Sequence, residues 1–380
     1  MKVVLDTFLR EVNEKTIEND QYPVLTSSKA GIFLQSDYFN KQVASRDSTG
    51  YKVIRRGQFT YRAMSDTGEF FPNMLDCTDI GIVSPAYPVF EITKPNVVDP
   101  QFLKYFFKSK GFQHSIAAFA QGSTRTSIKF GELKTITIDL PSIEKQAKIT
   151  RVLDKASNII QIRIKELQKF DYLIKARFVE LFGDPVSNPK GWTKKALSEE
   201  AEIKIGPFGS LLHKEDYITG GHALVNPSHI VDGRIVPDDK LTISDVKYDE
   251  LSAYHLRLGD VVMGRRGEMG RCAVVEQPGL LCGTGSLLIR TNGDLSADFI
   301  QKIISFPSFK RTIEDMAVGQ TMPNLNVPIV STFQIIKPPK SVQDQYYTFV
   351  AQVDKSKVAV QAALDKAQLL FDSLMQHYFG

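Results

Sequence analysis

The stretch GRRGEMG at residues 264–270 places two arginines among three glycines. Glycine lets the backbone turn tightly and approach another molecule closely, and guanidinium groups bind phosphates or the edges of guanine. The glycines recur at every third residue, which predicts a tight basic hairpin rather than a dinucleotide-binding loop. The first half of the chain has a similar group, RRG at residues 55–57, followed by Tyr61 and Arg62. The chemistry that these residues indicate is the binding of an anion.

Three other short stretches resemble parts of catalytic motifs but are incomplete. NPSH at residues 226–229 begins like the (N/D)PP(Y/F) signature of amino-methyltransferases, yet it lacks the second proline and the aromatic residue that stacks on a flipped base. CGTGS at residues 282–286 has no following lysine and is not a phosphate-binding loop. EIK at residues 202–204 is half of a nuclease ExK motif without a preceding PD. We predict turns or strands at all three places.

Composition sets broad limits on the class of protein. The 380 residues carry a formal net charge of +4, which permits nucleic-acid binding but does not argue for it. The three cysteines lack CxxC spacing and are expected to be reduced thiols in a cytosolic protein. The first fifteen residues contain charges where a signal peptide needs an apolar core, and no apolar run approaches eighteen residues. We therefore expect a cytoplasmic protein with no membrane segment.

The same short glycine-containing stretch, proline and long tract recur in the chain with an offset of 197 residues. AQGSTR near residue 122 is followed by a proline and a long charged and apolar tract, and AVGQT near residue 319 is followed by the same sequence of features. The matching pairs are Gly122 and Gly319, Thr124 and Thr321, Pro141 and Pro338, Gln146 and Gln343, Phe102 and Phe299, Phe182 and Phe379, and Gly183 and Gly380. This pattern indicates a tandem duplication with diverged halves.

Each half has the same predicted order of elements. Strand-like runs at residues 51–56, 81–92, 261–264, 272–276 and 286–290 are separated by glycine and proline turns. A long helix then follows, at 143–182 in the first half and 342–379 in the second, because apolar residues recur three or four apart without Pro or Gly. Each helix would be roughly 60 Å long.

Two such helices with one apolar stripe each should pack on each other. An antiparallel pair would place two globular units at opposite ends of a rod, related by a pseudo-twofold axis. The predicted fold class is α+β, with two mixed α/β domains joined by two long helices in an antiparallel coiled coil. The predicted segments are 1–140 and 186–337 for the domains, and 141–185 and 338–380 for the helices.

With these features in place, the whole chain resembles the specificity (S) subunit of a type I restriction-modification system. The resemblance rests on QGSTRTSIKFGELKTITIDLPSIEKQAKITRVLDKA, on FVELFGDP at the end of the first long helix, on KIGPFGSLLHKEDY at residues 204–217, and on YFN with YKVIRRGQFTYRAM in the first half. The resemblance implies a non-catalytic DNA-binding protein. Each domain would be a target recognition domain that reads one half of a split, asymmetric DNA sequence, and the helices would set the spacing.

The resemblance also implies partners and cofactors. We expect double-stranded DNA, two methyltransferase (M) subunits, and restriction or motor (R) subunits in the full complex, with no membrane. The chain itself would hold no cofactor or metal, because S-adenosylmethionine, ATP and Mg belong to the partner subunits. Two other classes stay open: a DNA methyltransferase or nuclease with degenerate motifs, and a protein-binding scaffold built on the coiled coil.

The candidate DNA-contacting residues are polar or basic side chains on predicted loops and strand ends, where a rigid frame can present them to DNA. They are Arg55, Arg62, Tyr87, Ser123, Thr124, Arg125, Lys204, Ser210, Lys214, Asn226, Arg265, Arg266, Arg271, Gln320, Thr321 and Asn324.

Overall fold

A computed structural model describes residues 1–38, 47–119, 126–317 and 324–380. The chain divides into two compact units. Unit 1 comprises Met1–Leu167 and Val358–Gly380, and unit 2 comprises Gln168–Lys357. Each unit therefore combines one mixed α/β domain with part of each long helix. The division into four segments at residues 140, 185 and 337 stays a prediction.

The two long helices are confirmed. Helix α5 spans Ile143–Phe182, as the sequence predicts. Helix α11 spans Lys340–Phe379 and begins two residues earlier than predicted, directly after the proline pair at residues 338–339. Helix α5 ends directly before Gly183, whose φ of 74° is the left-handed conformation that glycine adopts without strain.

Each unit holds the start of one long helix against the end of the other. In unit 1, Leu153 of α5 shares a core with Met375 of α11. In unit 2, Phe178 near the end of α5 shares a core with Tyr346 near the start of α11. The two helices are therefore antiparallel.

The central sheets of the two units have the same topology. In each, the first strand along the chain lies beside the last, and the two middle strands follow, all antiparallel. In unit 1 the order is β2 (Leu9–Val12), β10 (Val89–Ile92), β6 (Phe59–Thr60) and β8 (Asn73–Met74). In unit 2 it is β14 (Ala201–Ile205), β23 (Ser286–Thr291), β20 (Val261–Gly264) and β21 (Cys272–Val274).

Smaller strand pairs and short helices complete each domain. In unit 1 the pairs are β1 (Lys2–Val4) with β12 (Thr137–Asp139), β3 (Leu25–Ser28) with β4 (Gly31–Leu34), β5 (Lys52–Arg55) with β9 (Ile80–Val83), and β7 (Met64–Ser65) with β11 (Thr126–Ser127). In unit 2 they are β13 (Lys194–Ala196) with β24 (Gln334–Ile336), and β17 (Ile230–Val231) with β18 (Arg234–Ile235). A second sheet in unit 2 has the order β15 (Tyr217–Ile218), β19 (Thr242–Ile243), β16 (His222–Val225) and β22 (Leu281–Cys282).

Both domains also contain short helices. They are α1 (Gln35–Tyr38), α2 (Pro100–Phe106), α3 (Lys110–Ala117) and α4 (Phe130–Lys134) in unit 1, and α6 (Leu197–Glu200), α7 (Asp245–Glu250), α8 (Ala297–Ile304), α9 (Pro307–Met316) and α10 (Val327–Ser331) in unit 2. The five predicted strand runs are confirmed as β5, β9 with β10, β20, β21 and β23. The run at 81–92 is interrupted by a turn, because SPAYP carries two prolines that cannot donate to a sheet.

The duplication extends to individual hydrogen bonds. Gln146 and Gln343 are fully buried near the start of α5 and α11, and each bonds three backbone groups. The partners of Gln146 are the amide of Asp99 and the carbonyls of Val97 and Pro141, all at 2.9 Å. The partners of Gln343 are the amide of Ser296 at 3.4 Å and the carbonyls of Asp294 at 3.4 Å and Pro338 at 3.1 Å. Every partner is displaced by 197 residues, so the repeat predicted from the sequence is confirmed in three dimensions.

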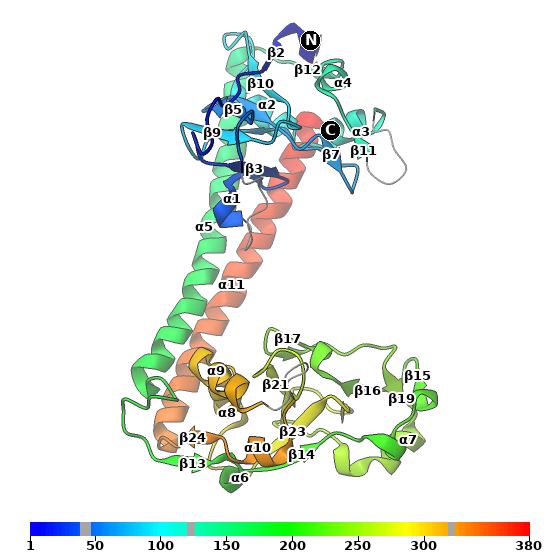
Figure 1. The fold of residues 1–380 in the computed structure, drawn as a ribbon, viewed down its shortest axis with the longest axis vertical. Coiled ribbons are helices and arrows are strands. Elements are labelled where there is room, and N and C mark those ends of the chain that lie inside the picture. Colours follow the sequence, from blue (N-terminus) through cyan, green and yellow to red (C-terminus); the bar gives the residue numbers. More distant parts are fainter. Residues whose placement is uncertain (39–46, 120–125, 318–323) are drawn as a thin grey trace. The chain divides into compact units, whose positions relative to one another are not determined.

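Equivalent aromatic contacts attach each domain to the end of a long helix. The rings of Phe102 and Phe379 lie 5.0 Å apart between centroids, and those of Phe182 and Phe299 lie 4.9 Å apart. The red end of α11 accordingly lies beside the first domain (Figure 1). Gly111 is required there, because a Cβ at this position would lie 2.2 Å from the carbonyl oxygen of Phe379. None of the helices in the described parts of the chain is both long and apolar enough to cross a bilayer.

Candidate nucleic-acid interface

Three loops of unit 2 leave the central sheet at one edge. Strand β20 ends at Gly264, which is paired with Ser286, the first residue of β23. Strand β14 ends at Ile205, which is paired with Leu287. Both strand ends thus lie opposite the start of β23. The basic hairpin at 264–271, the glycine loop at 283–285 and the loop at 206–214 therefore meet the sheet at this edge.

Asn226 packs against this edge through close backbone contacts. Its Oδ1 accepts a hydrogen bond from the amide of Gly285 at 3.2 Å. A Cβ on Gly283 would lie 2.3 Å from the same oxygen, so this position has no room for a side chain. The incomplete motifs at 226–229 and 282–286 are therefore one packed turn and one glycine loop. His229 belongs to the turn: it is buried, with Nδ1 2.7 Å from the carbonyl of Leu224.

The hairpin that carries the candidate arginines is confirmed and is held at its base. The Nε of Arg265 donates to Asn324 Oδ1 at 3.0 Å, and its backbone carbonyl accepts from the amide of Leu325 at 2.9 Å. Burial, followed by the charge of Arg266, lowers the pKa of Arg265. Arg266 is exposed, and no side-chain partner is found for it among the described residues. Arg266 is therefore the side chain of this hairpin that is best placed to meet an outside anion.

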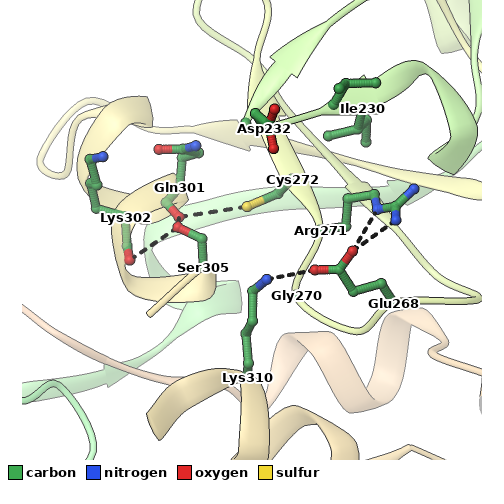
Figure 2. A pocket seen from close by; sticks show the side chains of 12 residues that line it. Ile230, Asp232, Glu268, Gly270, Arg271, Cys272, Gln301, Lys302, Ser305 and Lys310 are labelled. Carbon is green, nitrogen blue, oxygen red and sulfur yellow. Dashed lines mark hydrogen bonds and ion pairs between the residues drawn. The ribbon is translucent and has the colours of Figure 1, made fainter. Parts of the chain in front are cut away.

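Arg271, unlike Arg266, has a guanidinium group that is hydrogen-bonded within unit 2. It donates to Glu268 Oε2 at 2.8 Å and to the carbonyl of Pro227 at 3.1 Å. Figure 2 shows Glu268 between Arg271 and Lys310, whose Nζ lies 2.9 Å from Glu268 Oε1. The sequence displays Glu268 inside GRRGEMG, but its pairing with Lys310, 42 residues away, depends on tertiary packing.

Lys204, Ser210 and Lys214 lie on or beside the loop at 206–214. Lys204 is in β14, and its Nζ lies 2.7 Å from Glu202 Oε1. Ser210 and Lys214 are exposed in two successive turns of 3-10 helix. Of these three, Lys204 is the one tied to a carboxylate.

The candidates in unit 1 lie in two places. Arg62 and Tyr87 line the same surface hollow, and Arg62 Nη2 lies 3.8 Å from Asp66 Oδ2. Arg55 does not line this hollow; at the end of β5, it donates to Glu14 Oε1 at 2.6 Å. Tyr61, grouped with these residues on sequence grounds, is corrected to a core residue. It is fully buried, its hydroxyl donates to the carbonyl of Ile128 at 3.3 Å, and burial raises its pKa.

One backbone contact fastens the equivalent loop in both units. The amide of Ile128 donates to the carbonyl of Ala63 at 3.0 Å, and the amide of Leu325 donates to that of Arg265 at 2.9 Å. The donor residues, Ile128 and Leu325, are again 197 residues apart. We call this backbone hydrogen bond the clasp. The chain reaches the clasp directly after the repeated glycine segments. The candidates Ser123, Thr124, Arg125, Gln320 and Thr321 lie in those segments, outside the described residues.

Comparisons with known proteins agree with this architecture. Residues 13–169 match the sequence model of the type I restriction modification DNA specificity domain. The type I restriction enzyme MjaIX specificity subunit of Methanocaldococcus jannaschii is 23% identical over 309 residues, covering 75% of this chain and 69% of that protein. The MjaVIII specificity subunit of the same organism is 20% identical over 280 residues, covering 68% and 64%. These comparisons show that the chain is similar to type I restriction-modification specificity subunits.

Two solved structures from type I restriction-modification systems have a similar fold. The S subunit from M. genitalium has a TM-score of 0.55 at 15% identity and covers 100% of this chain and 96% of its own. A chain from a structural study of type I system assembly and conformational transition has a TM-score of 0.62 at 17% identity, covering 100% and 97%. Specificity subunits are the non-catalytic DNA-binding members of their complexes. The resemblance to a specificity subunit that the sequence predicted is confirmed by these comparisons, and the relatives belong to a non-catalytic class of subunit.

Proposed function

We propose that each unit reads one half of a bipartite, asymmetric DNA target. The clasp carries this proposal, because it holds the equivalent loop in the same way in both units while the side chains on that loop differ. Ala63 and Met64 stand in unit 1 where unit 2 has Arg265 and Arg266. Two copies of one frame with different side chains at the same edge suit a protein that recognises two different half-sites.

The long helices set the distance between the half-sites and bind the methyltransferase subunits. Each helix carries large apolar side chains in solvent, among them Tyr172 on α5 at 74% exposure and Leu369 on α11 at 72%. Apolar groups exposed along a helix favour burial against a protein partner. We infer two methyltransferase subunits, one for each half of the duplication, and restriction subunits in the full complex. S-adenosylmethionine, ATP and Mg would be held by these partner subunits, and the assembly would act in the cytoplasm.

The test is to map DNA methylation with the chain co-expressed with its methyltransferase subunits. Modified adenines should fall in a split sequence with a fixed spacer. Replacing both Arg265 and Arg266 with Ala should weaken DNA binding and reduce the slope of log K against log salt by up to about 1.8, at about 0.9 for each lost phosphate contact. If one arginine instead binds a guanine, discrimination at that base should relax by about 1–3 kcal/mol. Methylation without a split context, or a double variant with unchanged affinity, slope and target, contradicts the proposal.

A further inference from the structure

Glu268 lies between two cations at the base of the basic hairpin. Its Oε2 accepts from Arg271 Nη2 at 2.8 Å and from Nε at 3.3 Å, while its Oε1 accepts from Lys310 Nζ at 2.9 Å. Figure 2 shows both side chains turned toward the carboxylate from different elements, Arg271 from the hairpin and Lys310 from α9. We call these three residues the Glu268 triad.

A glycine makes the triad possible. Gly270 has a φ of 73°, and a Cβ at this position would lie 2.7 Å from Lys310 Cγ and 2.9 Å from the carbonyl oxygen of Ile304. Only glycine therefore lets the aliphatic stem of Lys310 run past the hairpin and bring Nζ to the carboxylate.

The three charged groups of the triad interact strongly with one another yet remain accessible to solvent. Hydrogen bonds from Lys310 and Arg271 lower the pKa of Glu268 to about 2, so the carboxylate is charged at any pH at which DNA binds. The exposed fractions of the side chains are 53% for Glu268, 34% for Arg271 and 30% for Lys310. A phosphate group arriving at this surface would meet two cations whose charge is already half neutralised.

The same pairing recurs at other cations proposed to face DNA. Glu14 binds Arg55 at 2.6 Å, Asp66 lies 3.8 Å from Arg62, and Glu202 lies 2.7 Å from Lys204. A phosphate that binds these cations competes with a carboxylate for their charge and N–H donors. This competition weakens contacts with any sequence, whereas hydrogen bonds to the correct bases are unaffected. The mild net charge of +4 fits this arrangement.

We propose that Glu268 is a specificity-determining residue that competes with DNA phosphates for Arg271 and Lys310. This inference rests on the proposed function of unit 2 as a DNA reader. Its role is to keep binding to non-target DNA weak, so that the protein depends on base contacts at the target.

The test compares Glu268→Gln with Glu180→Gln in the full chain assembled with its methyltransferase subunits. Gln keeps an oxygen that accepts hydrogen bonds, so the hairpin retains its shape while the competing charge is removed. Glu180 accepts from Arg177 Nη1 at 2.8 Å on α5, so the control makes the same change in net charge within another ion pair. Binding is measured against salt for a duplex that carries the mapped target and for one that lacks it.

For Glu268→Gln we expect tighter binding to the non-target duplex and a steeper salt slope. Each released cation that reaches a phosphate adds about 0.9 to the slope, which corresponds to about fivefold in affinity at 0.15 M salt. The ratio of target to non-target affinity should fall, and Glu180→Gln should leave all three quantities unchanged.

Three outcomes overturn the inference. Unchanged non-target binding in Glu268→Gln is one, and an equal rise in Glu180→Gln is another, because it assigns the effect to net charge alone. Weaker binding with a lower melting temperature in Glu268→Gln is the third, because it makes Glu268 only a brace of the hairpin. A wild-type complex that does not distinguish the two duplexes refutes the proposed function instead, which separates the two failures.

Discussion

Replacing Gln146 with Ala should loosen the junction between the first domain and α5. The side chain is fully buried and makes three hydrogen bonds of 2.9 Å to backbone groups of residues 97, 99 and 141. At about 1 kcal/mol of net stability for each bond, the loss is about 3 kcal/mol. The equivalent bonds of Gln343 are 3.1 to 3.4 Å long, so Gln343→Ala should cost about half as much.

Hydrogen exchange with peptide resolution is the suitable assay, because a chain of two compact units need not unfold in one step. In Gln146→Ala the amide of Asp99 should lose about 100-fold in protection, at 1.4 kcal/mol for each factor of ten. The corresponding amide of Ser296 in Gln343→Ala should lose roughly tenfold. Gln361→Ala is the control, because that side chain makes an exposed bond of 2.8 Å to Asp365 on the same helix. Equal protection in Gln146→Ala and Gln361→Ala, or a larger loss in Gln343→Ala, would refute the reasoning.

Three further outcomes can be checked directly. Deleting seven residues, two turns, from both α5 and α11 should shorten the preferred DNA spacer by about three base pairs, since roughly 10 Å of helix is removed; a folded variant that keeps the original spacer contradicts this role. A thiol reagent should label exposed Cys77 in the native protein but not buried Cys272 or Cys282, because burial raises the pKa of both thiols to about 12, and mass spectrometry of the labelled sites decides. A fragment ending near Pro185 should form a dimer that directs methylation to a palindrome of one half-site, and a soluble monomer would show that the halves are not interchangeable.

The long helices were the most predictable part of the structure. The tract 143–182 contains no Pro or Gly and is bounded by Pro141 and Gly183, so local chemistry alone determines where α5 begins and ends. The hairpin at 264–271 was also predictable, because Gly267 and Gly270 adopt turn conformations three residues apart. Features that depend only on local sequence can therefore be predicted without the structure.

Features that depend on distant contacts were not predictable. Tyr61 directly follows β6 and precedes Arg62, and only its packing in the core of unit 1 makes it a buried residue. Arg271 has the same side chain as Arg266, but Glu268 and Pro227 hold its guanidinium within the unit. The sequence identifies the basic residues, but it does not show which of them form ion pairs or hydrogen bonds within the protein.

The bonds of the two buried glutamines explain how a duplicated frame can keep its shape while its sequence diverges. Gln146 and Gln343 bond only main-chain groups of the domain. The identity of the partner residue is therefore free to change, and Val97 in the first half is indeed Asp294 in the second. The hydrogen bonds of the junction therefore depend on the glutamine side chain and not on the side chains of its partners.

The clasp extends this reasoning to the surface proposed to read DNA. Its donors and acceptors are also main-chain groups, from Ile128 to Ala63 in unit 1 and from Leu325 to Arg265 in unit 2. A methyl group and a guanidinium group can therefore occupy equivalent places without any change in the hydrogen bond that positions them. Because the frame is held by backbone atoms and the anion-binding chemistry by side chains, substitutions on these loops can change the sequence that is read without a cost to the fold. In the proposed function, that separation would let the two copies of one unit read different half-sites within a single chain.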